Sequence, residues 1–214
     1  MANWIPYLKM IELLSQNVKG LGQEFKRRKV FNWLHNSTAS IFFLQETHSS
    51  AKDEQIWKSE WGGQNIVFSH GESNARGVCI LFKNNLFVEI HSSIVDESGR
   101  YIILDVTVDS MRIVLCNIYG PNHDDPYFFI TLFGQIEAIQ ESNFIVAGDF
   151  NTIGDPEVDK FGGNPHKNKN SRQALNALKE EMDIVDIWRI RNPDTQEFTF
   201  RCMRPERILS RLDY

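Results

Sequence analysis

Short apolar runs recur along the chain and are separated by polar turns. Several of them are apolar at every position, which is typical of strands buried on both faces. Asp109-Ser110 lies between two such runs and predicts a hairpin. The pattern predicts strands over Met10–Ser15, Ile41–Leu44, Ile66–Phe68, Val78–Phe82, Tyr101–Val108, Met111–Tyr119, Phe144–Ala147, Phe198–Phe200 and Ile208–Leu212.

Helical spacing of apolar residues occurs in three other segments. Phe25–His35 carries one apolar face, and a second helix is predicted around Phe129–Ile136. Ser171 is expected to cap a third helix. Its inner face would consist of Leu175, Leu178, Met182 and Val185. The preceding segment, Gly154–Asn170, is rich in Gly, Pro, Asn and Lys and is expected to be a loop.

The order of these elements favours an α/β fold in which two sheets pack on each other and helices lie outside. Hairpins interrupt the strict alternation of strand and helix that a doubly wound parallel sheet requires, although that fold remains the alternative. No internal repeat or strong linker divides the chain. We therefore expect residues 1–214 to form a single domain.

Composition narrows the class of protein. A hydrophobic fraction of 42% and a charged fraction of 24% exclude fibrous, collagen-like and wholly disordered proteins. The net charge of −5 excludes a uniformly basic surface but permits a local basic face. Three scattered cysteines, no secretory signal and no long apolar run predict an intracellular protein without a membrane span.

Side chains that can bind a metal ion or move a proton follow several of the apolar runs. Asp149 and Asn151 end one predicted strand, and Asn117 and Tyr119 end another. Side chains two apart on a strand project to the same face, so Asp149 and Asn151 are predicted to point together while Phe150 enters the other layer. A carboxylate beside an amide can hold a water molecule and orient it for attack.

Each of these residues also has a structural interpretation. Asn17, at the end of the first predicted strand, can turn the chain before Gly20. Glu46 can be a solvated strand end or a helix cap, and Tyr119 a core aromatic. Asp149 can bond its own backbone in a turn.

Four blocks of residues give the sequence a wider resemblance. They are Gln45-Glu46-Thr47-His48, Asn117-Ile118-Tyr119-Gly120-Pro121-Asn122, Gly148-Asp149-Phe150-Asn151-Thr152 and Ser210-Arg211-Leu212-Asp213-Tyr214. In this order they resemble the signature blocks of the endonuclease/exonuclease/phosphatase superfamily. Within it, Thr152, Ser171-Arg172-Gln173, Asp186-Ile187-Trp188-Arg189 and Phe198-Thr199-Phe200 resemble the apurinic-endonuclease-like domain of LINE-type non-LTR retrotransposons.

The resemblance covers nearly the whole chain and implies a fold and an activity. The fold is the deoxyribonuclease-like four-layer arrangement, a sandwich of two mostly antiparallel sheets flanked by helices, with its site at one end. The activity is divalent-metal-dependent nicking of DNA, which leaves a 3′-hydroxyl and a 5′-phosphate. In the LINE setting that 3′-hydroxyl primes reverse transcription.

The resemblance also implies a role for each matching residue. Glu46 is the metal-binding carboxylate for Mg²⁺ or Mn²⁺, with Asn17 close by. Asp149 activates or orients the attacking water, and Asn151 supports it. The remaining matches are Tyr119 near the scissile phosphate, Thr199 and Ser210 at substrate-contacting positions, and Asp213 as the carboxylate that orients the catalytic histidine.

The catalytic histidine itself has no counterpart in this sequence. The family closes with a Ser-Asp-His block, whereas none of the six histidines follows Asp213. We therefore expect a C-terminally truncated domain, cut from a polyprotein or a truncated genomic copy, with weak or no activity. His48, beside Glu46, is interpreted as a family-typical loop histidine and not as a substitute.

Basic residues near the predicted site suggest a nucleic-acid partner. Lys160–Arg172 contains four cations and no acid, which makes Lys167 and Arg172 candidate DNA contacts. Arg189–Arg211 has a local charge of +3. An ordinary solvated surface is the alternative for both segments. We expect the partner to be target duplex DNA and the protein to be a monomer. The parent polyprotein is expected to carry a reverse transcriptase and to act in the nucleus.

Two other functions remain open at this point. The first is a phosphatase of the same superfamily acting on a small phosphoester, since fold alone does not decide the substrate. The second is a non-catalytic remnant, which the missing histidine favours. Nicking of plasmid DNA and phosphate release from small esters would separate them.

Overall fold

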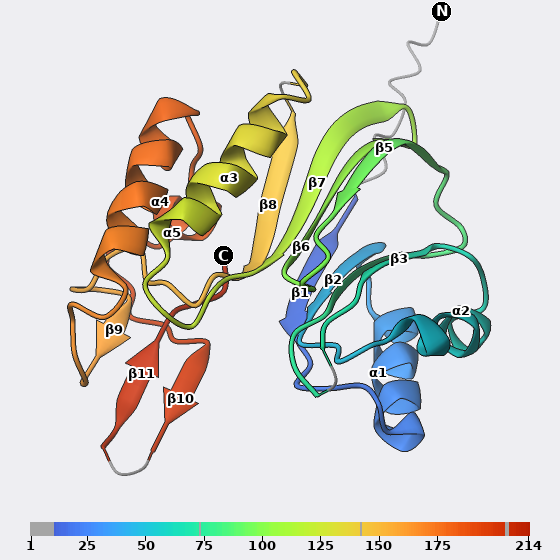
Figure 1. The fold of residues 1–214 in the computed structure, drawn as a ribbon, viewed down its shortest axis with the longest axis horizontal. Coiled ribbons are helices and arrows are strands. Elements are labelled where there is room, and N and C mark those ends of the chain that lie inside the picture. The colour runs from blue at the N-terminus through green and yellow to red at the C-terminus, as the bar shows by residue number, and fades with distance from the viewer. Residues whose placement is uncertain (1–10, 73, 142, 204–205) are drawn as a thin grey trace, which may run out of the picture.

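Two four-stranded sheets form the centre of the molecule in the computed structural model, which describes residues 11–72, 74–141, 143–203 and 206–214 (Figure 1). One sheet has the order β1-β2-β4-β3, formed by Leu13–Asn17, Ile41–Gln45, Val78–Phe82 and Ile66–Ser69. The other has the order β5-β6-β7-β8, formed by Val88–Val95, Tyr101–Val108, Met111–Tyr119 and Phe144–Asp149. The β1–β2 and β7–β8 pairs are parallel and the other pairs are antiparallel. The predicted start of the first strand, Met10, lies outside the described residues.

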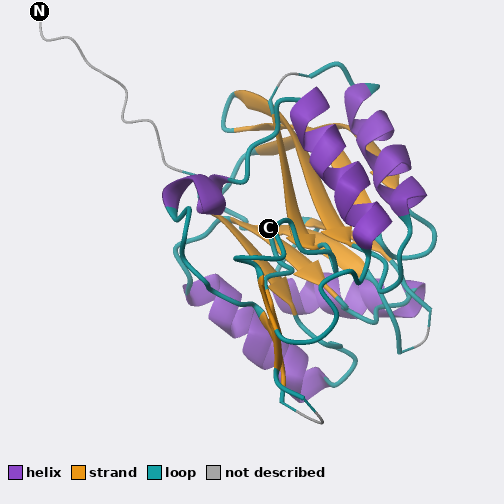
Figure 2. Ribbon diagram, turned by 90° about the vertical axis from the view of Figure 1, so that its left-hand side faces the viewer, coloured by secondary structure: helices purple, strands orange, loops and turns teal. Residues whose placement is uncertain are grey.

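Helices cover the outer faces of both sheets (Figure 2). The first sheet packs against α1 (Glu24–Asn36) and α2 (Glu54–Trp61), which follows a short 3₁₀ turn η1 (Ala51–Asp53), and the second packs against α3 (Pro126–Glu137) and α4 (Lys169–Glu181). This arrangement confirms the predicted four layers and excludes the doubly wound alternative. None of the described helices combines the length and apolarity needed to cross a lipid bilayer.

A small third sheet closes one end of the molecule. It has the order β10-β11-β9, formed by Phe200–Cys202, Ile208–Ser210 and Lys160–Phe161. The short helix α5 (Ile187–Arg191) precedes it in the chain. The C-terminal residues then return to β8, where Asp213 forms a bridge with Asp149.

Strand β4 shows why the central runs are apolar at every position. Val78, Ile80 and Phe82 face the second sheet, whereas Cys79 and Leu81 face α1 and α2. Side chains on a strand alternate between faces, and here both faces are covered. Cys79 is a free thiol that is fully buried, as expected for a cysteine used as a small hydrophobe.

A buried pair of amides joins the two sheets just below the predicted site. Asn117 on β7 donates to the carbonyl oxygens of Leu44 (3.1 Å) and Cys79 (2.9 Å) across the sandwich. Its own amide oxygen accepts from Gln45 Nε2 at 2.7 Å. These bonds satisfy Asn117, which has no exposed surface. They hold the last residues of β2 against β7, so that Glu46 and Tyr119 leave the sandwich side by side.

The predicted start and inner face of α4 were wrong in two details. Ser171 lies inside the helix, and the N-cap residue is Asn168. The backbone N–H of Ser171 instead donates to the carboxylate of Asp124 at 2.7 Å, a residue distant in sequence. Val185 is 56% exposed because α4 ends at Glu181.

Candidate active site

Asn17 links two carboxylates that come from different sheets. Its Nδ2 donates to Glu46 Oε1 at 2.8 Å and to Asp149 Oδ2 at 2.9 Å. Its Oδ1 accepts from the backbone N–H of Lys19 at 3.1 Å, which fixes the direction of the amide. Asn17 therefore stabilises the turn, as its structural interpretation predicts, and it also brings Glu46 and Asp149 together.

The strand arrangement explains how residues so distant in sequence meet. Asn17 ends β1 and is paired with Gln45, the last residue of the parallel strand β2. Glu46 follows immediately. Asp149 is the last residue of β8, which is parallel to β7 and pairs Tyr119 with Asp149. Parallel neighbours end at the same edge of a sheet, and the two sheets place these edges at the same end of the sandwich.

Backbone strain is concentrated at this end of the sandwich. Lys19, Glu46, His48 and Asn151 have positive φ values of 48°, 52°, 55° and 49°. Residues other than glycine adopt this left-handed conformation at a cost of about 1 kcal/mol or more. Such strain persists where the surrounding structure imposes it, and it is commonly found at functional sites.

Asp149 is almost completely buried at the base of the site. Its Oδ1 accepts from the backbone N–H of Asn151 at 3.0 Å. Burial raises the pKa of Asp149 to about 6, and the negative charges of Asp213 and Glu46 add to this rise. The hydrogen bonds from Asn17 and Asn151 act in the opposite direction. A carboxyl group with a raised pKa in a cleft is typical of a proton-transfer site.

Asn151 differs from its predicted orientation. Its side chain donates to the carbonyl oxygen of Gly120 at 2.9 Å, and only its backbone N–H bonds Asp149. The alternation of side chains does not reach Asn151 because β8 ends at Asp149 and Asn151 has a left-handed backbone. Phe150 packs in the layer against α3, as predicted.

Tyr119 is a core aromatic residue that also contacts Glu46, and its predicted place near the scissile phosphate stays a prediction. Its side chain packs between the two sheets, and burial raises its pKa to about 12, with further contributions from the charge of Glu46 and a hydrogen bond with it. A pocket of about 400 Å³ opens beside these two residues. Arg76 and Arg100 also line this pocket. Neither arginine is predicted from the sequence, since each follows a turn and belongs to no basic run.

The oxygen atoms of the site suit a hard divalent cation. Glu46 Oε1 accepts one hydrogen bond from Asn17, and Oε2 lies 3.9 Å from Nε2 of His48. Across the described ranges, no group of three or more His, Cys, Asp or Glu side chains is arranged to hold a metal ion. Mg²⁺ commonly binds through one or two carboxylates and retains several waters, so Glu46 fits that ion better than a zinc-type cage. Because Asn17 presents nitrogen to the carboxylates, its role as a metal ligand stays a prediction.

The C-terminal segment places Asp213 opposite Asp149. Phe150 N–H donates to the carbonyl of Leu212 at 2.8 Å, and Gly148 and Tyr214 exchange two backbone hydrogen bonds of 3.0 and 3.1 Å. Burial raises the pKa of Asp213, against the effect of its hydrogen bond with Thr199.

Thr199 and Ser210 support this segment. Thr199 Oγ1 accepts from the backbone N–H groups of Leu212 (3.0 Å) and Asp213 (3.3 Å). Ser210 is buried in β11. Their predicted contacts with substrate stay predictions.

The segment Lys160–Arg172, here called the basic loop, lies beside the site. Lys160 has a lowered pKa because of partial burial and the nearby charges of Lys167 and Arg172, so the three cations gather in space. Asn168 Nδ2 donates to the carbonyl of Asn151 at 3.0 Å and ties the loop to the end of β8.

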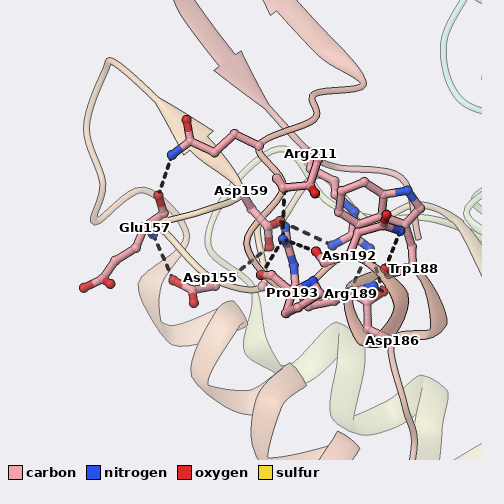
Figure 3. Close-up of polar contacts among 12 residues, drawn as sticks. Asp155, Glu157, Asp159, Asp186, Trp188, Arg189, Asn192, Pro193 and Arg211 are labelled. Carbon is pink, nitrogen blue, oxygen red and sulfur yellow. Dashed lines mark hydrogen bonds and ion pairs between the residues drawn. The ribbon is translucent and has the colours of Figure 1, made fainter.

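The second basic segment contributes less to the surface than its charge suggested. Arg189 and Arg211 both bond Asp159, and Arg211 also bonds Asp186 (Figure 3). Arg211 is buried. Neither guanidinium is therefore free for DNA, and Arg204 lies outside the described residues.

Comparisons with known proteins agree with this geometry. The family described as Endonuclease/Exonuclease/phosphatase matches residues 14–214. The Transposon TX1 uncharacterized 149 kDa protein of Xenopus laevis is 30% identical over 207 residues, which is 95% of this chain and 16% of the relative. The chain thus spans about a sixth of that relative's length.

Solved structures share the fold at low sequence identity. The APE2 catalytic domain of Xenopus laevis has a TM-score of 0.71 and 20% identity, covering 94% of this chain and 80% of the other. The endonuclease domain of TRAS1, a telomere-specific non-LTR retrotransposon, has a TM-score of 0.59 and 13% identity, covering 94% and 82%. The matched segment, the relative and the sandwich together show that this chain belongs to the endonuclease/exonuclease/phosphatase family.

Proposed function

We propose that this protein is a divalent-metal-dependent DNA endonuclease that hydrolyses one phosphodiester of a target duplex. The observation that carries the proposal is the contact of Asn17 Nδ2 with both Glu46 and Asp149. One amide thereby holds a candidate metal carboxylate and a candidate base within reach of the same substrate phosphate. The product nick would carry a 3′-hydroxyl, which can prime reverse transcription.

Each candidate residue is proposed to have one role in the hydrolysis. Glu46 would hold Mg²⁺ or Mn²⁺, which stabilises the negative charge that develops on the phosphate and on the leaving oxygen. Asp149 accepts the proton of the attacking water, and the N–H of Asn151 and the amide of Asn17 fix its orientation. Tyr119 lies beside Glu46 at the pocket and contacts the scissile phosphate.

The DNA would lie across the basic loop and the pocket. Lys167 and Arg172 reduce the repulsion of phosphates beside Asn151, and the binding should weaken as salt rises. Similarity to a transposon protein of 149 kDa supports a target-site role within a larger polyprotein. We further propose that this polyprotein carries a reverse transcriptase and acts in the nucleus.

Residues 1–214 alone should turn over slowly. Within the described ranges, the side-chain hydrogen bond recorded for Asp213 is with Thr199, and no histidine ring bonds it. Asp213 lines a groove of about 860 Å³, a volume many times that of a free imidazole. Added imidazole is therefore expected to raise the rate by supplying the absent ring.

A plasmid assay tests this function. Protein in excess over supercoiled plasmid is expected to produce open circles slowly with Mg²⁺ or Mn²⁺, faster with imidazole, and not with EDTA. A DNA polymerase should extend the nicks directly, since their ends are 3′-hydroxyls. Release of phosphate from small esters without nicking would indicate the phosphatase instead. Failure of both reactions, with imidazole present, would leave a non-catalytic remnant.

A further inference from the structure

Four charged side chains form a cluster beside the candidate site, and two of them, Asp159 and Arg211, are buried (Figure 3). We call Asp159, Asp186, Arg189 and Arg211 the Asp159 cluster. Asp159 is 2% exposed and Arg211 is 4% exposed. Two carboxylates balance two guanidinium groups, as burial of charge requires. The residues come from the loop after β8, from α5 and its N-cap, and from the end of β11, so the cluster joins three separate segments.

Asp159 is the centre of this cluster. Its Oδ1 accepts from Arg189 Nη2 and from Arg211 Nη1, the latter at 3.3 Å. Its Oδ2 accepts from the backbone N–H of Asp155 at 2.9 Å. The carbonyl oxygen of Asp159 accepts from the backbone N–H of Arg211, also at 2.9 Å. Asp159 thus holds Arg211 through both main chain and side chain.

Most of the remaining donors of the arginines are also occupied, whereas Arg189 Nε is buried without a hydrogen-bond partner among the described residues. Arg211 Nη2 donates to both carboxylate oxygens of Asp186 at 2.7 Å, and its guanidinium lies over the Tyr214 ring at 4.3 Å from the centroid. Arg189 Nη1 donates to the carbonyl oxygens of Asn192, Pro193 and Thr195 at 3.0 Å each. These contacts leave the arginines little freedom to serve any other partner.

Arg211 stands at the start of the segment that reaches the site. Leu212 and Tyr214 bond β8 through Phe150 and Gly148, and Asp213 forms a bridge with Asp149. A shift of Arg211 would therefore shift Asp213 relative to Asp149. Asp159 contacts Arg211 and so bears on the pairing of Asp213 with Asp149, although it is distant in sequence from Asp213.

We propose that Asp159 is a positioning residue of this enzyme. By holding Arg211 it keeps residues 212–214 in register with β8, and so keeps the Asp213 carboxylate beside Asp149. The catalytic part of this inference rests on the proposed function. The alternative is that the Asp159 cluster only stabilises the fold.

The test compares Asp159→Asn with a matched control, Asp105→Asn. Asp105 on β6 is also a buried carboxylate, paired through two bonds of 3.0 and 2.7 Å with Arg112, but it lies outside the Asp159 cluster. Hydrogen exchange at the amides of Phe150 and Tyr214 reports the pairing with β8 directly. Asp159→Asn should accelerate exchange at both by about tenfold or more, with β2 and β4 unchanged. Asp105→Asn should leave both amides as in the wild type.

Nicking kinetics supply the second readout. Asp159→Asn is expected to lower the single-turnover rate at saturating DNA by about a hundredfold, while the DNA dissociation constant stays within about twofold. If Asp159→Asn does not fold, the double variant Asp159→Asn/Arg189→Gln, which keeps one guanidinium against Asp186, takes its place.

Two results would overturn the proposal. One is a folded variant with wild-type exchange at Phe150 and Tyr214, and the other is an equal acceleration in Asp105→Asn. If the wild type does not nick DNA even with imidazole present, the endonuclease proposal fails on its own. The exchange measurement still decides whether Asp159 sets the register.

Discussion

Replacement of Gly148 by alanine is expected to destabilise the protein by about 4 kcal/mol or more. Gly148 has a φ of +143°, and a Cβ added there would lie 2.1 Å from the carbonyl oxygen of Ile118 and 2.9 Å from its nitrogen. Both are backbone atoms of β7, so relief of the clash would separate β7 from β8. Thermal unfolding should show a midpoint about 10 °C or more below that of the wild type.

Gly134→Ala is the matched control for this prediction. Gly134 lies in α3, and apart from its chain neighbours and the adjacent backbone of the helix itself, no atom lies within 4 Å of the Cβ position. Alanine there should stabilise the helix by about 0.5–1 kcal/mol. A wild-type midpoint for Gly148→Ala would show that the close approach of β8 to β7 is wrong.

Asp149→Asn should lower the nicking rate by about 10²–10⁴-fold, because an amide cannot accept the proton of the attacking water. The variant keeps the shape of the side chain and an oxygen for the N–H of Asn151, and loses only the hydrogen bond that Asn17 Nδ2 donates to Oδ2. DNA binding in EDTA and the thermal midpoint should therefore change little. Single-turnover nicking with protein in excess measures the effect even if the wild type is slow.

Asp194→Asn makes the same chemical change at an exposed position. It should nick at the wild-type rate. Equal rates for Asp149→Asn and the wild type, with both folded and both bound to DNA, would remove Asp149 from the reaction.

Local signals were sufficient for the central strands. The predicted bounds Val78–Phe82, Tyr101–Val108 and Met111–Tyr119 agree with β4, β6 and β7. These strands are largely apolar because both of their faces are covered, and the polar Asp109-Ser110 turn marks where β6 ends and β7 begins. The bounds of these strands could therefore be predicted from local sequence, without information about the strands beside them.

The elements that escaped prediction lack such signals. The strand β5 has a bulge between Ile90 and Ser92 that interrupts its alternation, and most of its residues are exposed. The helix α2 has eight residues, and its buried face consists of Trp57 and Trp61. Two aromatic residues four apart are too short a pattern to identify a helix.

The site residues at strand ends could be predicted from the sequence, but the side-chain partners that come from distant parts of the chain could not. Glu46 and Asp149 were identified at strand ends, and the structure brings them to the same amide of Asn17. The partners of Arg189 and Arg211 were missed because their carboxylate, Asp159, lies far from both in sequence. Charge counted along the sequence assigns such arginines to the surface, whereas the fold pairs them inside.

Groups from distant strands are proposed to meet around one divalent ion at the end of the sandwich. Anomalous diffraction from crystals soaked in Mn²⁺ locates that ion. We expect one strong peak in coordination contact with the Glu46 carboxylate, on the side that faces Asp149, and its loss in Glu46→Gln. A well-occupied Mn²⁺ bound elsewhere in the molecule, with none at Glu46, would contradict this expectation.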